Sequence, residues 1–143
     1  MGWIDIETSA DVQNLMQRVE CFHDWYLAGL SYDPLARAES KNPACWITDS
    51  DSLIIRFRYD STNKDGAWPE FCMEFNGVYT VTFANFKEPD PFDDCMLLKT
   101  NQGWLFTEGG LLNQDELSHP ENIRANIVVF CEKVRWNPLD SGL

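Results

Sequence analysis

The side chains best suited to chemistry lie in one short stretch, CFHDWYLAGLSYD, at residues 21–33 of this 143-residue chain. His23 and Asp24 are adjacent there, and Cys21 stands two positions before the histidine. Residues of these types can act in nucleophilic catalysis, bind zinc, or form hydrogen bonds with the backbone at the end of a helix. The sequence around them decides which of the three uses is expected.

Nucleophilic catalysis needs a Cys or Ser beside a His that a carboxylate orients. The chain has only two histidines, His23 and His119, and neither is placed by sequence next to a nucleophile. Because neighbouring side chains alternate in direction along an extended chain, we expect Asp24 to point away from His23. His119-Pro120 is typical of a surface loop or a helix start. We therefore predict no catalytic residues and lean against an enzyme.

A zinc site would need closely spaced Cys and His pairs. Cys21 and His23 form such a pair, but no other cysteine has a Cys or His at that spacing. We predict no metal and no other cofactor. An odd number of scattered cysteines is typical of reduced, buried thiols in the cytoplasm rather than of a disulfide framework; they are Cys21, Cys45, Cys72, Cys95 and Cys131.

Acidic residues gather in KEPDPFDD, residues 87–94, and again between Asp60 and Glu70. Neither segment has the ligand order of a calcium-binding EF-hand loop, so solvated acidic loops are expected. Tryptophans usually pack in a core, but Trp3 and Trp68 stand in polar surroundings and are candidate interface residues. The candidate partner- or ligand-binding residues are His23, Asp24, Trp68, Glu88, Asp90, Asp93 and Asp94.

The net charge of −12 argues against nucleic acid and anionic membranes as partners, since both are themselves negative. A basic protein would be attracted. No basic segment precedes an apolar stretch at the N-terminus, and no window approaches the run of about 20 apolar residues that a membrane helix needs. We therefore expect a soluble cytoplasmic protein. Its length predicts a single domain over residues 1–143.

The periodicity of apolar residues predicts an α+β fold, with an N-terminal amphipathic helix packed on a mostly antiparallel sheet of six or seven strands. Residues 9–20 have the spacing of a helix, which Thr8 and Asp11 should begin with a capping box. Residues 52–59 alternate as a strand with one buried face, and Arg56 and Arg58 on its other face should pair with carboxylates such as Glu74.

In EFCMEFNGVYTVTFANF, residues 70–86, Asn-Gly would usually indicate a hairpin turn. We instead predict one long strand bent near Gly77, because only a continuous strand or a three-residue loop keeps all its odd-numbered apolar residues on one face. The spacing of Leu27 and Leu30 similarly predicts a β-bulge near Ala28 and Gly29. Further strands are expected at 45–48, 95–100, 103–108 and 126–136, with a short helix in LLNQDELSHPENIR.

The order FHDWYLAGLSYD, LIIRFRYD and EFNGVYTVTF resembles a set of small bacterial domains, over about residues 10–86. Their shared pattern is aromatic-His-Asp, spaced aliphatic residues, a Tyr-Asp turn, a strand and a Phe-x-Gly-Val segment. The matching residues are Phe22, His23, Asp24, Leu27, Leu30, Tyr32, Asp33, Phe75, Gly77 and Val78. Some of these domains are immunity proteins of polymorphic toxin systems. The resemblance implies a small α+β domain without established enzymatic activity, and it gives His23 and Asp24 no catalytic role.

Three functions are consistent with these observations. The first is a non-enzymatic cytoplasmic binding protein, in its most specific form an immunity-type inhibitor of a basic toxin. The second is a small ligand-binding protein or enzyme with a pocket near His23. The third is a structural, homo-oligomeric module that pairs exposed strand edges.

Overall fold

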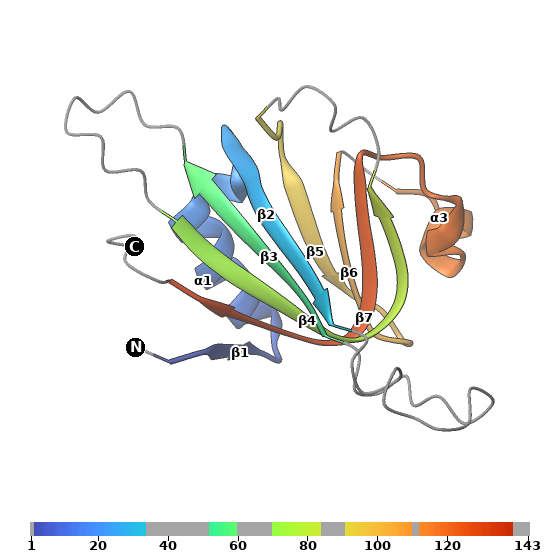
Figure 1. Cartoon of the computed structure of the whole chain (residues 1–143). Coiled ribbons are helices and arrows are strands. Elements are labelled where there is room, and N and C mark those ends of the chain that lie inside the picture. The colour runs from blue at the N-terminus through green and yellow to red at the C-terminus, as the bar shows by residue number, and fades with distance from the viewer. Residues whose placement is uncertain (1, 34–51, 60–69, 84–90, 110–111, 139–143) are drawn as a thin grey trace.

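The computed structural model describes residues 2–33, 52–59, 70–83, 91–109 and 112–138. They form an α+β arrangement in which a seven-stranded sheet predominates (Figure 1). The elements in chain order are β1 (Ile4–Ile6), α1 (Ser9–Val19), η1 (Glu20–Phe22), β2 (Trp25–Asp33), β3 (Ser52–Tyr59), β4 (Glu70–Phe83), β5 (Cys95–Lys99), β6 (Trp104–Glu108), α3 (Gln114–Ser118), η3 (Pro120–Asn122) and β7 (Ile127–Asn137).

The strand order is β2-β3-β4-β7-β6-β5, and every pairing is antiparallel. The long strand β7 pairs with β4 along one side. Its other side pairs with β6 near the start of β7 and with β1 near its end. The sheet curls strongly, with α1 and α3 at opposite sides of it (Figure 1). Strands β2 and β5 are the two edges of the main path through the sheet.

Helix α1 begins as predicted. Thr8 is its N-cap, and the side chains of Thr8 and Asp11 each accept a hydrogen bond from the other residue's backbone N–H, which makes a capping box. Its apolar face buries Leu15 and Val19 completely. Strand β1 was not predicted, because three residues are too short to show a period of two.

The core lies on the inner face of the sheet and is rich in aromatic rings. Phe22, Phe57, Phe71 and Phe106 are fully buried and contact one another, with ring centroids 5.0 to 6.0 Å apart. Three tryptophans join this core, which confirms the expectation that tryptophans pack inside; they are Trp25, Trp104 and Trp136. A smaller apolar cluster on the other face of β7 lies beside α3 and contains Leu105, Ile123, Val128 and Phe130.

Strand β4 is continuous, as predicted, and bends at Gly77, whose φ of +65° is accessible to glycine at little cost. The prediction that all odd-numbered apolar residues of this strand lie on one face is wrong at Tyr79. The register shifts between Val78 and Thr80, so an extra residue is accommodated there. This bulge turns the ring of Tyr79 to the outer face, where it lies 5.3 Å from that of Phe130.

The predicted bulge in β2 is confirmed, because the register with β3 shifts between Leu27 and Gly29. Arg56 Nη2 donates a hydrogen bond to the carbonyl of Ala28, at 3.3 Å. The expected pairing of a β3 arginine with a carboxylate of the neighbouring strand is confirmed for Arg58, but the partner is not Glu74. Arg58 instead binds Glu70, at 2.6 Å, because the two residues are direct partners in the β3–β4 register.

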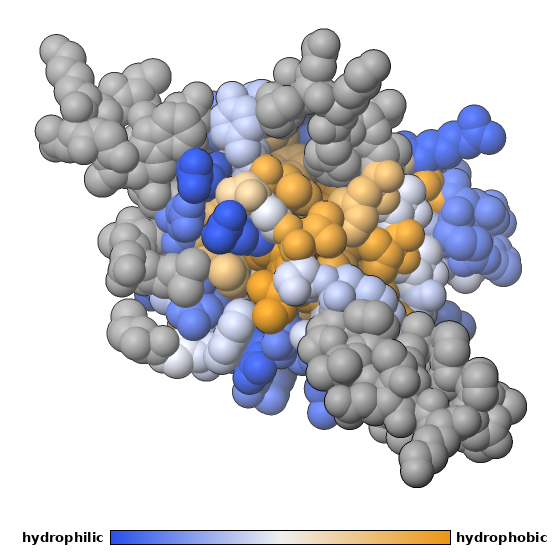
Figure 2. All heavy atoms as spheres, in the orientation of Figure 1, coloured by the Kyte–Doolittle hydropathy of each residue, from blue (hydrophilic) through white to orange (hydrophobic). Residues whose placement is uncertain are grey.

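An apolar hollow of about 410 Å³ lies where β2 and β4 approach their ends, and Leu30, Val78 and Val81 contribute to its lining. Leu30 is 48% exposed and Val81 is 38% exposed. Figure 2 shows apolar side chains gathered in the middle of this face of the molecule. The apolar inner face of the sheet therefore reaches the surface here.

Within the described ranges, no helix is long and apolar enough to cross a membrane. Several predictions concern residues outside those ranges. They are the loop at 33–44 beyond Asp33, the strand at 45–48, the turn at 60–69, Cys45 and the candidate residues Trp68, Glu88 and Asp90.

Candidate functional site

The segment that leads into β5 packs against the turn between α1 and β2. The N–H of Asp24 donates to the carbonyl of Phe92 at 3.0 Å, and the N–H of Phe92 donates to the carbonyl of Trp25 at 2.8 Å. We call residues 20–25 together with 92–94 the edge junction, because these bonds join the two edges of the sheet at one end. The junction brings together two of the predicted candidate regions, His23 with Asp24 and Asp93 with Asp94.

The backbone of the turn is strained. Four residues other than glycine have positive φ, namely Glu20 (51°), Cys21 (55°), Phe22 (65°) and Asp24 (67°). Such conformations cost about 1 to 3 kcal/mol each and persist only where the surroundings enforce them. Burial of the Phe22 ring between Phe57 and Phe106 holds the turn from the inside, and the two bonds to Phe92 hold it from the edge. The turn is therefore a firmly held structure on the protein surface.

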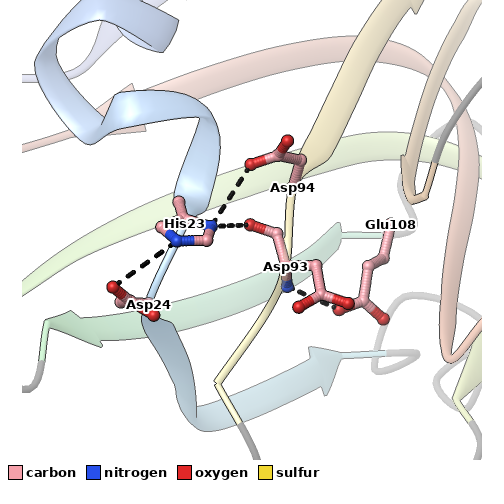
Figure 3. Close-up of polar contacts among 5 residues, drawn as sticks. All are labelled: His23, Asp24, Asp93, Asp94 and Glu108. Carbon is pink, nitrogen blue, oxygen red and sulfur yellow. Dashed lines mark hydrogen bonds and ion pairs between the residues drawn. The ribbon is translucent and has the colours of Figure 1, made fainter.

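His23 completes the junction through its ring (Figure 3). Its Nδ1 lies 2.7 Å from the carbonyl oxygen of Asp93, so Nδ1 carries a proton and donates. The same nitrogen is 3.5 Å from Asp94 Oδ1, and Nε2 is 3.7 Å from Asp24 Oδ2. The hydrogen bond to the Asp93 carbonyl, and then the negative charges of Asp24, Asp94 and Asp93, raise the pKa of His23 above its ordinary value.

The expectation that Asp24 points away from His23 is wrong. It assumed an extended chain, whereas the φ of +67° at Asp24 turns its carboxylate back toward the imidazole. His23 was expected to form a hydrogen bond with an exposed backbone group. Its ring does so with the carbonyl of Asp93, which lies 70 positions further along the chain. Asp24 contributes to the same structure through its backbone N–H, which donates to the carbonyl of Phe92, rather than through its carboxylate.

Glu108, at the end of β6, supports the junction and was missed in the sequence. Its Oε2 accepts a hydrogen bond from the N–H of Asp93 at 3.1 Å, as Figure 3 shows, and its Oε1 accepts one from Asn126 Nδ2 at 3.2 Å. The N–H of Gly109 also donates to the Asp94 carbonyl at 2.9 Å. These contacts arise from the pairing of β5 with β6, which places Glu108 opposite Cys95. The residues next to Glu108 in the sequence indicate only a polar side chain at the end of a strand.

Three carboxylates around the junction are available to a partner. The side chain of Asp24 is 58% exposed, that of Asp94 is 70% exposed, and that of His23 is 57% exposed. Asp93 is exposed as well. A surface of this kind attracts cationic groups through charge and through the acceptor oxygens of its carboxylates. In the described part of the chain, no three His, Cys, Asp or Glu side chains gather closely enough to hold a metal ion.

The cysteines differ in exposure more than predicted. Cys21 lies in the strained turn and is exposed, against the expectation that the cysteines are buried. Cys95 and Cys131 are buried, and the loss of hydration raises the pKa of Cys131 to about 12 and that of Cys95 further still. These two thiols are therefore poor nucleophiles.

Trp3, a predicted interface residue, is half-buried and lies beneath the guanidinium of Arg135, which is 4.7 Å from its ring centroid.

No family model, curated protein or solved structure matches this chain. Its function is therefore inferred from the chemistry of its described surface.

Proposed function

We propose that this chain is a non-enzymatic cytoplasmic binding protein whose edge junction binds a basic protein partner. The observation that carries the proposal is the convergence of Asp24, Asp93 and Asp94 around one turn, in a chain with a net charge of −12. The resemblance of the FHDWYLAGLSYD segment to immunity proteins supports a more specific form, an inhibitor that blocks a basic toxin.

The junction is suited to a protein partner because its charges are exposed and its backbone is held in place. Exposed carboxylates keep their hydration until a partner arrives, so they contribute mainly to the rate of encounter and to specificity. Complementary charge can raise association rates well above those of neutral surfaces, and salt weakens this effect. Because the junction backbone is held by the bonds of Asp24, Trp25 and Phe92, little ordering is needed when a partner binds.

The two other functions have less support. A pocket near His23 would need the imidazole to face a cavity, but the ring is 57% exposed and its Nδ1 is engaged by the Asp93 carbonyl. Self-association through strand edges would bring together two chains that each have a net charge of −12. Their mutual repulsion disfavours a homo-oligomer at low salt.

Coexpression with the product of the neighbouring gene tests the proposal, with copurification and growth rescue as readouts. A stable complex and rescue are expected. The charge variant is Asp93→Asn with Asp94→Asn, and its control is Asp115→Asn with Glu132→Gln, which removes two exposed negative charges elsewhere.

The junction variant should slow association by about tenfold at low salt, while the control pair should change it far less. Failure to copurify and to rescue would contradict the proposed function. Equal effects of the two variant pairs would show that net charge, rather than the junction, attracts the partner.

A further inference from the structure

A groove runs along α3 on the outer side of the molecule. It consists of two adjoining hollows of about 450 and 590 Å³, and Gln102 and Ser118 line both. Asn101 and Gln114 lie at one end, and Tyr79 and Glu121 lie at the other. Each volume is in the range of about 300 to 1,000 Å³ that is usual for small-molecule sites. Because the hollows share two residues, one elongated ligand can occupy both.

An aromatic ring forms part of the second hollow. Tyr79 is the most exposed large apolar residue of the described chain, at 56%. The bulge in β4 turns it to the outer face, and Phe130 supports its ring on one side at a centroid distance of 5.3 Å. Bulges are frequent where a side chain is aimed at a binding site. The ring therefore offers a surface on which a flat, partly apolar molecule can stack.

Polar side chains with unused hydrogen-bonding capacity border the same groove. Within the described ranges, the side-chain amides of Asn101, Gln102 and Gln114 and the hydroxyl of Ser118 make no hydrogen bond to the protein. The carboxylate of Glu121 lies 3.3 Å from His119 Nδ1 and retains free acceptor positions. Amides and hydroxyls both donate and accept, so they match a ligand that is rich in hydroxyl groups.

We propose that this groove binds a neutral oligosaccharide of two or more sugar rings, one of which stacks on Tyr79. A sugar ring combines an apolar C–H face with hydroxyls at its rim, which corresponds to the ring of Tyr79 beside the amides and Ser118. Two adjoining hollows favour more than one ring. The net charge of −12 and the carboxylate of Glu121 disfavour a nucleic acid and an acidic sugar, although Lys99 lines the first hollow. The groove uses no residue of the edge junction, so this inference is independent of the proposed function.

The test is an NMR titration of the whole chain with maltotriose, cellotriose, mannotriose and triacetylchitotriose, each to about 10 mM, which detects weak sugar binding. At least one trisaccharide should produce saturable shifts at Tyr79, Gln102 and Ser118. Tyr79→Ala should weaken its affinity by about tenfold, and Tyr79→Phe should retain most of it, because stacking needs the ring rather than the hydroxyl. Tyr32→Ala removes an exposed tyrosine outside the groove and should leave the affinity unchanged.

Absence of saturable shifts with all four trisaccharides would overturn the inference. So would a sugar that binds Tyr79→Ala as tightly as the unaltered chain, provided the spectrum shows that the variant is folded. A single-stranded oligonucleotide serves as a further probe, and shifts at Tyr79 with the oligonucleotide but with none of the sugars would show that the ring stacks on bases instead.

Discussion

Glu74 on β4 and Arg135 on β7 face each other directly across the sheet, and Arg135 Nε donates a hydrogen bond to Glu74 Oε1 at 2.6 Å. Asn76 Nδ2 donates to the same oxygen at 2.8 Å. The guanidinium of Arg135 also covers the ring of Trp3, which precedes β1. One arginine thus connects three neighbouring parts of the sheet, and the side chain of Glu74 is only 10% exposed.

Arg135→Ala should destabilise the fold by about 1 to 3 kcal/mol, because it leaves the buried carboxylate of Glu74 without its main donor. Arg58→Ala is the matched control, since the Arg58–Glu70 pair is more exposed and should contribute about 0.2 to 1 kcal/mol. Urea unfolding at pH 7 measures both variants. Equal losses would show that burial of Glu74 does not govern the energy of its pair.

His23 should make stability depend on pH near neutrality. Its pKa is raised in the folded protein by the Asp93 carbonyl and then by the carboxylates around it, so the folded state binds the proton more tightly than the unfolded chain. This contribution is fully present below the ordinary value of 6.5 and is lost as the pH rises through the folded pKa.

An NMR titration of the His23 ring should therefore give a pKa above that of the same residue in a peptide of residues 20–26. Asp24→Asn should lower the pKa of His23 toward the peptide value, because it removes one of the charges that favour the imidazolium. His23→Gln should abolish the loss of stability above pH 6.5 relative to the unaltered chain. A folded pKa at or below the peptide value would contradict the geometry of the junction.

Gly77→Ala should destabilise the protein by about 1 to 3 kcal/mol, because an alanine at φ +65° is strained and its Cβ would lie 2.9 Å from that of Glu132. Gly29→Ala is the control, since its new Cβ would meet the movable end of Arg56 at 3.2 Å. Its cost should stay within about 0.5 kcal/mol. Thermal and urea unfolding give both values, and a smaller loss at Gly77 than at Gly29 would be inconsistent with the bend in β4.

Cys21 should be alkylated by iodoacetamide much faster than Cys131 and Cys95. Burial raises the pKa of Cys131 from 9.0 to about 12, which lowers its thiolate fraction roughly a thousandfold. Mass spectrometry of the alkylated peptides over time measures each site separately. Labelling of Cys131 at the rate of Cys21 under native conditions would mean that the centre of the sheet opens readily.

The elements that depend on neighbouring residues were well predicted from the sequence. The start of α1 at Thr8, the alternation along β3, the continuity of β4 and the bulge near Ala28 all follow from patterns within a few residues. Backbone geometry and the burial of one face produce these patterns locally. The seven-stranded antiparallel sheet agrees with the expected architecture for the same reason.

The candidate site needed the tertiary structure. His23 meets the carbonyl of Asp93 and Glu108 meets the N–H of Asp93 only because the curled sheet brings its two edges together at one end. The strained φ of Asp24 and the turned ring of Tyr79 are enforced by surrounding contacts and by ladder register, so no local pattern indicates them. The sequence therefore determined which segments become helix and strand, whereas long-range packing decided which side chains meet, because those contacts exist only once the sheet has curled and its register is set.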